Sequence, residues 1–488
     1  MAKLGRHERR EAMSKVDTAW LRMEKSTNLM MISGVMILDT PLVLDSLKQL
    51  LTHRFLAFER FRQKAVTEDS SSCWEIDEDF DIDWHVRRSA LPGAASKVEL
   101  QDFVSQLAST PLDQSKPLWQ FHLIECFGAG SALVMRIHHC YADGIALVQV
   151  LLSLTDVSPI PSPDASLPAA WLKEDGERVT KEFFDPAKER LDQAMKFGGK
   201  LLKKGVDMYL RPTLAGVLVA EGSGIVAELA HALSLRDDPP TSLKGPLGVV
   251  KRCAWAEPLP LAEVKTICAA LGCTVNDALM ACVAGALRAY LIEQGEDVDA
   301  LTIRATVPVN LRPLEHAKKL GNHFGLVFLD LPIGEANPLA RLRRVTASMG
   351  EIKASKQALV TYGALAALGM APASVQRLAL EYLSRKATAV ATNVPGPPMP
   401  LYLAGARLRQ TMFWVPQSGG IGLGVSILSY DGGVHFGLMS DRKRLADPDA
   451  VIARFRLEFE KLLYIVMMEE WDGAIGPADA QATLERFG

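Results

Sequence analysis

The spacing of apolar residues divides the first third of the chain into alternating strand-like and helix-like segments. Residues 30–38 form an unbroken apolar run with β-branched members, which predicts a buried strand. Residues 42–54 and 98–107 instead carry apolar residues at helical spacing, which predicts two amphipathic helices. Residues 120–126 and 132–137 predict two strands joined by a glycine-rich turn. This mixture of strands and helices indicates an α/β fold.

A second pattern of the same kind occupies the other half of the chain. Residues 276–290 predict a strong helix, and residues 301–309 and 323–331 predict strands. Residues 410–430 contain Pro416 and four glycines, and they predict a strand, a turn and another strand. The chain therefore contains two globular regions of similar design.

The segment between these regions differs from both. Residues 158–168 hold four prolines, which mark a domain edge. Residues 174–244 are charged and largely helical in pattern, as expected of a connecting arm. The predicted division is a first lobe at 1–165, a helical connecting arm at 166–245 and a second lobe at 246–488.

Residues 357–376 form a stretch without charged side chains that is long enough to cross a bilayer. The stretch also holds several polar residues, two glycines and a proline, so we interpret it as a buried or tunnel-lining helix. The mean hydropathy of +0.09 is slightly apolar and leaves room for an apolar cavity or a membrane-facing patch.

Composition excludes some classes of protein. With 488 residues, 48% hydrophobic and 23% charged, the chain is a folded globular protein of several domains. The 54 basic and 57 acidic residues give a net charge of −3, which provides no general electrostatic reason to bind nucleic acid. Seven scattered cysteines without a C-x-x-C pair indicate a reducing compartment. Residues 1–14 lack the apolar core of a signal peptide, so we expect a cytoplasmic protein.

The sharpest chemical signal is an HHxxxDG string at a predicted strand-to-helix loop. It begins with His138 and His139 and ends with Asp143 and Gly144. A histidine at the end of a strand is held rigidly, and its ordinary pKa of about 6.5 lets it accept and return a proton near neutral pH. Asp143 is also placed to cap the helix that follows.

Other interpretations of the string compete with proton transfer. Both histidines are also compatible with buried structural roles. Adjacent strand residues point to opposite faces, so His138 and His139 cannot easily share one metal ion, and we predict no metal. We interpret Cys140 as a small residue that packs within the loop. The chain lacks the G-x-S-x-G elbow of esterases and a phosphate-binding G-x-x-x-x-G-K-[ST] loop.

The HHxxxDG string resembles that of the CoA-dependent acyltransferase superfamily, which includes chloramphenicol acetyltransferase, carnitine acyltransferases and the condensation domains of peptide synthetases. The chain is most similar to one branch, the bacterial wax ester synthase/diacylglycerol acyltransferases, over roughly residues 12 to 470. The further matching residues are, in chain order, Asp17, Glu24, Met30, Phe61, Arg62, Gln63, Pro117, Leu118, Trp119, Asn276, Asp277, the PVNLR string ending at Arg312, Gly321, Asn322 and the NVPGP string beginning at Asn393.

The chain departs from this family pattern at a few positions. Cys140 and Tyr141 stand where a small and then an apolar residue are more usual, Thr392 where serine is frequent, and Met31 where histidine is frequent. We expect these differences to affect the fit of the substrate more than the chemistry. We interpret three lysines of the connecting arm as part of a solvent-exposed helix face. The alternative is that they bind CoA phosphates or anionic lipid head groups. They are Lys200, Lys203 and Lys204.

The resemblance implies roles for the residues of the string. It implies that His139 is the general base, that His138 supports it, and that Asp143, followed by Gly144, is structural. In the superfamily this aspartate pairs with an arginine away from the substrate, for which Arg312 is the candidate here. A surface position for this arginine is the alternative.

The resemblance also implies roles outside the string. Asn276 is expected beside Asp277 at a helix start, either as a cap or as a group that orients His139 or stabilises the oxyanion. Thr392 and Asn393 are expected to line the substrate channel. The string expected to pack beneath the site is Pro117, Leu118 and Trp119.

The implied fold has two α/β lobes of the chloramphenicol acetyltransferase type, with an active-site tunnel between them. The implied activity is transfer of a long-chain acyl group from acyl-CoA to a long-chain fatty alcohol, a diacylglycerol or both. No cofactor is expected, since the CoA thioester is a substrate. Peripheral contact with the inner membrane or with lipid inclusions is expected, and the oligomeric state is left open. A condensation enzyme with carrier-bound substrates and a non-catalytic lipid-binding protein are the alternatives.

Overall fold

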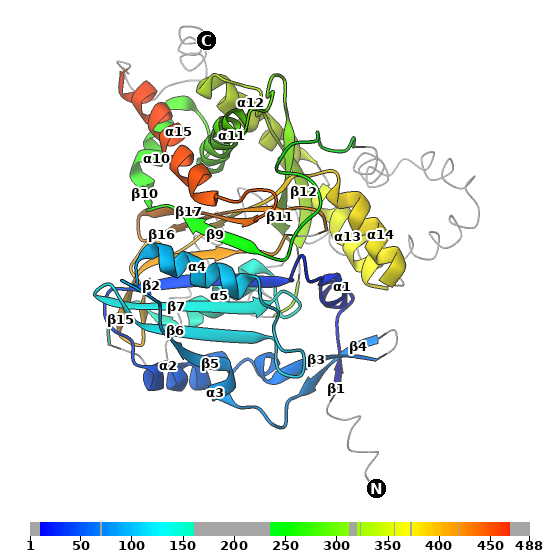
Figure 1. Ribbon diagram of the computed structural model, residues 1–488, viewed down its shortest axis with the longest axis vertical. Helices are drawn as coiled ribbons and strands as arrows, with labels where there is room; N and C mark the ends of the chain where they lie inside the picture. The colour runs from blue at the N-terminus through cyan, green and yellow to red at the C-terminus, as the bar shows by residue number, and fades with distance from the viewer. Residues whose placement is uncertain are drawn as a thin grey trace, which may run out of the picture.

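The computed structural model describes two sheet-centred lobes that pack against each other (Figure 1). The predicted α/β class is confirmed. The arm predicted at 174–244, including Lys200, Lys203 and Lys204, falls largely outside the described residues, as does Arg312. The described part of this arm, 235–244, has no helix, since Pro239 and Pro240 lack the amide hydrogens that a helix needs. The described residues are 10–68, 71–160, 235–311, 320–322, 324–355, 357–370, 373–417 and 419–468.

The first lobe is built on a seven-stranded sheet. Its central strands β6 and β7 form the predicted hairpin, and Gly128 takes a φ of 59° in the turn between them. Strand β2 is buried at every position, as its apolar sequence predicts. In spatial order the strands are β5 (Val86–Ser89), β6 (Trp119–Phe127), β7 (Gly130–His138), β2 (Met31–Leu38), β15 (Ala406–Trp414), β14 (Tyr402–Leu403) and β8 (Thr155–Asp156).

The helices of the first lobe pack around this sheet. Helix α4 begins at a capping box, in which Ser96 and Glu99 satisfy each other's backbone amides. A small three-stranded sheet flanks the lobe and contains β1 (Arg10–Ala12), β4 (Ser71–Ile76) and β3 (Gln63–Glu68). The helices are α1 (Lys15–Met23), α2 (Leu44–Leu50), α3 (Ile82–His85), α4 (Lys97–Ala108) and α5 (Gly144–Ser153).

The second lobe has its own seven-stranded sheet, with helices over one face (Figure 1). Its path is β10 (Leu259–Pro260), β17 (Gly433–Asp441), β16 (Leu423–Tyr430), β13 (Ala389–Pro395), β11 (Ile303–Asn310) and β12 (Phe324–Leu331), with β9 (Lys251–Trp255) also paired to β17. The helices are α10 (Leu261–Leu271), α11 (Val275–Glu293), α12 (Pro338–Ala354), α13 (Gln357–Met370), α14 (Ala373–Ser384) and α15 (Pro448–Met468).

Strands β14 and β15 cross from the second half of the sequence into the first sheet. Strand β15 pairs with β2, and β14 pairs with β8. The strand, turn and strand predicted at 410–430 exist, but the two strands, β15 and β16, lie in different sheets. The predicted boundary at residue 246 therefore does not separate the two sheets. The physical reason is that β2, a fully buried strand, needs a partner on its second edge.

The uncharged stretch at 357–376 contains the whole of α13 and the start of α14. Helix α13 ends at Met370 and α14 starts at Ala373, on either side of a proline that cannot donate a helical hydrogen bond. Among the described residues, one helix is long and apolar enough to cross a membrane, and it is α11. Because 78% of its apolar window is buried inside the protein, α11 is a core helix of the second lobe.

Candidate active site

The loop that carries the HHxxxDG string connects β7 to α5. The His139 amide donates to the Met30 carbonyl at 2.7 Å, which ties the loop to the start of β2. Asp143 is the N-cap of α5, and its side chain accepts a hydrogen bond from the Ala146 amide at 2.8 Å. The predicted capping role of Asp143 is therefore confirmed. Hydrogen bonds therefore hold the loop at both ends.

The imidazole of His139 is enclosed by aromatic rings. It stacks on Trp20 with ring centroids 4.2 Å apart, and the Phe324 ring lies 5.7 Å away. The residue is 4% exposed. Burial lowers its pKa to about 4, against an opposing effect of the Asp143 carboxylate. The ring is consequently neutral at pH 7 and able to accept a proton.

His138 faces away from this ring, as strand alternation predicts. Its Nδ1 accepts a hydrogen bond from the Cys140 amide at 3.1 Å, which places the ring proton on Nε2. Its Nε2 lies 2.9 Å from the Glu24 carboxylate. His138 thus braces the loop from inside the first lobe. Among the described residues, no group of three or more histidine, cysteine, aspartate or glutamate side chains is placed to hold a metal ion.

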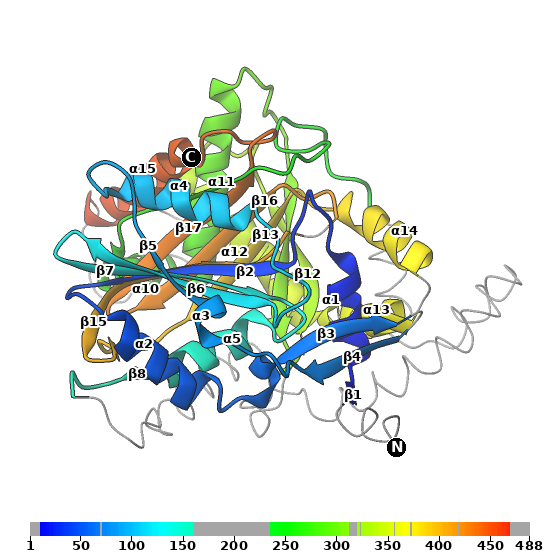
Figure 2. The same ribbon diagram turned by 60° about the horizontal axis from the view of Figure 1, so that its bottom comes forward.

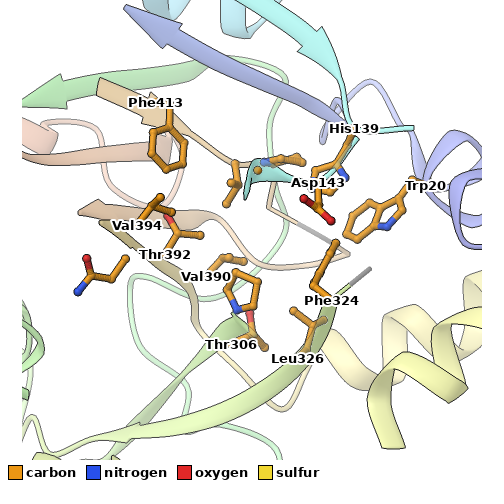
Figure 3. Close-up of a pocket in the computed structure, with 15 residues that line it drawn as sticks. Trp20, His139, Asp143, Thr306, Phe324, Leu326, Val390, Thr392, Val394 and Phe413 are labelled. Carbon is orange, nitrogen blue, oxygen red and sulfur yellow. The ribbon is translucent and has the colours of Figure 1, made fainter. Parts of the chain in front are cut away.

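A pocket with about 730 Å³ of empty space opens beside His139, between the two sheets (Figure 3). His139, Asp143 and Trp20 lie at one end, and Thr392, Val394 and Phe413 lie toward the other. The residues that line it are Trp20, His139, Asp143, Gly144, Thr306, Pro308, Phe324, Leu326, Val390, Thr392, Asn393, Val394, Phe413, Val415 and Pro416.

The two residues predicted to line a channel, Thr392 and Asn393, are both in the pocket wall. Thr392 is buried on β13, with its hydroxyl 3.4 Å from both the Val425 carbonyl and the Ser426 hydroxyl. Asn393 is more exposed and donates to Asn276 Oδ1 at 3.0 Å. The second lobe therefore supplies the wall opposite His139.

Asn276 is not where the sequence analysis places it. It does not line the pocket, and its side chain contacts Asn393 and the Met349 sulfur. The cap of α11 is Thr274, which forms a capping box with Asp277. Asn276 therefore reaches the pocket wall through Asn393, and its action on His139 or on an oxyanion stays a prediction.

Pro117, Leu118 and Trp119 lie beneath the loop. The Leu118 carbonyl accepts from the His138 amide at 2.9 Å, and the Leu118 amide donates to the Tyr141 hydroxyl at 3.0 Å. Trp119 is fully buried and donates through Nε1 to the Phe61 carbonyl at 2.8 Å. The string supports the loop through packing and hydrogen bonds.

The departures from the family pattern are mostly away from the pocket. Met31, Cys140 and Tyr141 are buried in the first lobe and do not line the pocket, so any effect of these three residues on substrate fit is indirect. Thr392 does line it. Burial raises the pKa of the Cys140 thiol well above its usual value, which makes it a poor nucleophile.

Sequence reasoning assigned no role to Trp20 or Phe324, which enclose His139, or to Asn322. The Asn322 side chain donates to the His139 carbonyl at 2.9 Å and to Asp17 at 2.7 Å. A local signal existed for Asp17 and Trp20, since an aspartate three residues before a tryptophan puts both on one helix face. No local signal connects this helix to residues some 300 positions away.

The catalytic-domain model of the wax ester synthase/diacylglycerol acyltransferase family matches residues 13–279, and the C-terminal-domain model of that family matches residues 320–463. The chain belongs to this family. A probable diacylglycerol O-acyltransferase of Mycobacterium tuberculosis is 31% identical over 395 residues, which cover 80% of this chain and 83% of the relative. The family match and such relatives make the protein an acyl-CoA-dependent O-acyltransferase.

Solved structures agree with this family fold. The wax ester synthase/diacylglycerol acyltransferase from Marinobacter aquaeolei has a TM-score of 0.65 at 24% identity, over 94% of this chain and 100% of the other. A starter condensation domain of rhizomide synthetase, solved in complex with C8-CoA, has a TM-score of 0.58 at 13% identity, over 98% of both chains. The expected two-lobed fold of the CoA-dependent acyltransferases is confirmed.

Proposed function

We propose that this family member transfers a long-chain acyl group from acyl-CoA to the hydroxyl of a long-chain alcohol or a diacylglycerol, with His139 as the general base. The observation that carries the proposal is the neutral, buried imidazole at one end of a largely apolar pocket between the lobes. The relatives named as diacylglycerol O-acyltransferases support a hydroxyl acceptor. The family match favours this function over that of a condensation enzyme.

The reaction follows from the chemistry of the groups in the pocket. His139 takes the proton of the acceptor hydroxyl while the hydroxyl oxygen attacks the thioester carbonyl. The carbonyl oxygen becomes an oxyanion in the tetrahedral intermediate. The tetrahedral intermediate then expels the CoA thiolate, and the imidazolium returns its proton to the sulfur. No acyl-enzyme is formed in this scheme.

The pocket lining matches lipid substrates. Beyond His139 the wall is made mainly of apolar side chains from β12, β13 and β15, among them Leu326, Val394 and Phe413. Such a wall favours methylene chains over water, at about 0.8 kcal/mol for each buried CH₂. It also keeps water away from the thioester, which protects the acyl group from hydrolysis.

We propose further that the enzyme works at the surface of a membrane or lipid inclusion, through α14. Val375 and Leu378 lie on one face of this helix and are 49% and 65% exposed, with the exposed Arg377 between them. Figures 1 and 2 place α1, α13 and α14 side by side at one edge of the molecule. Helix α14 contacts α13, and α13 packs on β12, which lines the pocket. An apolar acceptor that leaves the lipid surface at α14 would therefore be close to the pocket.

The acyl-transfer proposal is tested with the purified full chain and palmitoyl-CoA. Hexadecanol and dipalmitoylglycerol are offered separately, thiol release is followed by absorbance, and the esters are separated by chromatography. We expect CoA release that depends on an acceptor, with a matching amount of ester. Release that is independent of any acceptor, or no release with either one, would contradict the proposal.

The surface proposal is tested by flotation with vesicles of phosphatidylcholine and phosphatidylglycerol. The double variant Val375→Ser with Leu378→Ser is expected to bind several-fold less than the unmodified protein. Val98→Ser, which changes a similarly exposed valine on α4, is the matched control and is expected to bind normally. The proposal fails if the unmodified protein stays with the vesicle-free fraction at every salt concentration.

A further inference from the structure

A buried amide connects the His139 loop to helix α1. The Nδ2 of Asn322 donates both to the His139 carbonyl, at 2.9 Å, and to Asp17 Oδ1, at 2.7 Å. Because both partners are acceptors, they fix which end of the amide is the nitrogen. Asn322 is 2% exposed and Asp17 is 7% exposed. The contact is therefore shielded from competing water.

Asp17 is itself held in place by its own helix. Its amide donates to the Ser14 hydroxyl at 3.1 Å, in the cap of α1, and its Oδ1 also accepts from the Asn322 amide at 3.2 Å. Burial raises the pKa of the Asp17 carboxyl above its usual value, against the effect of these hydrogen bonds. One turn further along α1, Trp20 stacks on the His139 ring. Helix α1 thus supports both the ring of His139 and, through Asn322, its carbonyl.

Asn322 reaches the loop from the second lobe. The preceding Gly321 forms a bridge with Ala142, and its carbonyl accepts from the Asp143 amide at 3.3 Å. Gly321 takes a φ of 115°, which side chains strongly disfavour. The segment therefore crosses from one lobe to the other and lies directly against the HHxxxDG loop.

The His139 ring needs such support from its backbone. Among the described residues, no acceptor forms a well-aligned hydrogen bond with its buried Nδ1, whereas histidines in functional sites are commonly oriented by an acceptor at the second ring nitrogen. The ring is oriented instead by the rings of Trp20 and Phe324 and by the position of its main chain. A shift of the carbonyl moves the imidazole within the pocket.

We propose that Asn322, held by Asp17, is a positioning residue for His139. It fixes the main chain of the base so that the imidazole meets the acceptor hydroxyl at a productive distance and angle. Asn322 does not line the pocket and acts through His139 alone. The inference rests on the proposed function, since it assumes that His139 is the base.

The test compares Asn322→Ala, Asp17→Ala and Asp17→Asn in acyl transfer from palmitoyl-CoA. Asn322→Ala and Asp17→Ala are expected to lower kcat at least about 10-fold, with the KM for palmitoyl-CoA changed less than about 2-fold. Asp17→Asn retains an oxygen that can accept from Asn322 and is expected to restore most of the rate. If Asn322→Ala does not fold, the two Asp17 variants carry the test.

The pH profile separates positioning from a structural loss. Apart from burial, the groups that affect the titration of His139 are Asp143, the His139 backbone and the Asn322 side chain, which raise its pKa, and His138, which lowers it. Without Asn322 or the Asp17 acceptor, we expect a looser, more hydrated ring. Burial is the largest effect on the pKa of His139 and the raising effect of Asn322 is the smallest, so the gain in hydration dominates and the acid limb of kcat/KM moves upward from about pH 4. A loss of folded protein would lower the whole profile without moving the limb, and that result would overturn the proposal.

Gln410→Ala is the matched control. Gln410 is a buried amide of the first sheet that donates to the Ala256 carbonyl of the second lobe at 2.9 Å. It pairs with Ile37 near the far end of β2, whereas His138 pairs with Met31. We expect this variant to keep kcat and its pH profile. An equal effect of Gln410→Ala would overturn the inference, whereas unchanged activity of His139→Ala would instead refute the proposed function.

Discussion

Two helix starts, those of α5 and α11, are alike in local chemistry and different in use. Each begins at a side-chain cap, Asp143 for α5 and Thr274 for α11. The start of α5 forms part of the pocket wall, while the start of α11 lies behind that wall and reaches it through the contact of Asn276 with Asn393. A capping motif therefore shows where a helix begins, and the tertiary structure alone decides whether that helix start meets a substrate.

The largest expected effect on the rate is that of His139→Ala, in the loop that leads into α5. The variant to compare with it is Asn276→Ala, at the start of α11. Loss of a general base lowers the rate by about 10²–10⁴-fold, so His139→Ala should reduce kcat for ester formation by that factor. The measurement is CoA release from palmitoyl-CoA with hexadecanol, together with a circular dichroism spectrum to show folding. A folded His139→Ala variant with full activity would show that the base assignment is wrong.

The next effect is that of Asp143→Ala, compared with Thr274→Ala. Both changes remove a helix cap, at about 1 kcal/mol of unfolding free energy each. Asp143→Ala is also expected to lower kcat about 10-fold or more, because the loop that holds His139 loses its anchor. Thr274→Ala should leave kcat within about 2-fold. The measurements are urea unfolding and steady-state kinetics, and an inactive Asp143→Ala variant with unchanged stability would contradict a structural role.

A smaller effect is expected for Asn276→Ala. Its Oδ1 accepts from Asn393, so its loss frees a side chain of the pocket wall without touching the base. We expect a change of about 2- to 5-fold in the KM for the acceptor and little change in kcat. The measurement is a set of initial rates at several acceptor concentrations. A decrease in kcat as large as that of His139→Ala would return Asn276 to the reacting centre.

The smallest effect is that of pH on the rate. Burial lowers the pKa of His139 to about 4, so the base stays deprotonated above that value, and kcat/KM should change less than about 2-fold between pH 5 and 7. A base with the ordinary histidine pKa of about 6.5 would lose most of its activity at pH 5. Initial rates at low substrate concentration between pH 5 and 7 distinguish the two pKa values.

The same burial predicts how stability depends on pH. The folded state keeps His139 neutral down to about pH 4, while the unfolded chain takes up its proton near pH 6.5. The unfolding free energy should therefore decrease as the pH falls from about 6.5 to 4. His122 and His435, whose pKa values burial also lowers to about 4, add to this decrease. Urea unfolding at several pH values measures it.

Local patterns in the sequence predicted most of the elements that build the site. The apolar run that forms β7, the glycine turn before it and the cap at Asp143 each depend on neighbours within a few residues, and all were predicted correctly. The place of Asn276 behind the pocket wall was not predicted, because it depends on its contact with Asn393 of β13, which no local pattern records. Trp20 and Asn322 were missed for the same reason, since His139 contacts both from distant parts of the chain.

The crossing of β15 into the first sheet has a consequence for biosynthesis. A ribosome releases β2 long before β15, so the nascent first lobe exposes one edge of an apolar strand until more than 400 residues are made. A fragment that stops before β14 would retain this open edge and would be prone to self-association. Strand β15 also brings Phe413 to the pocket, so cutting the chain between its halves would remove part of the substrate wall as well.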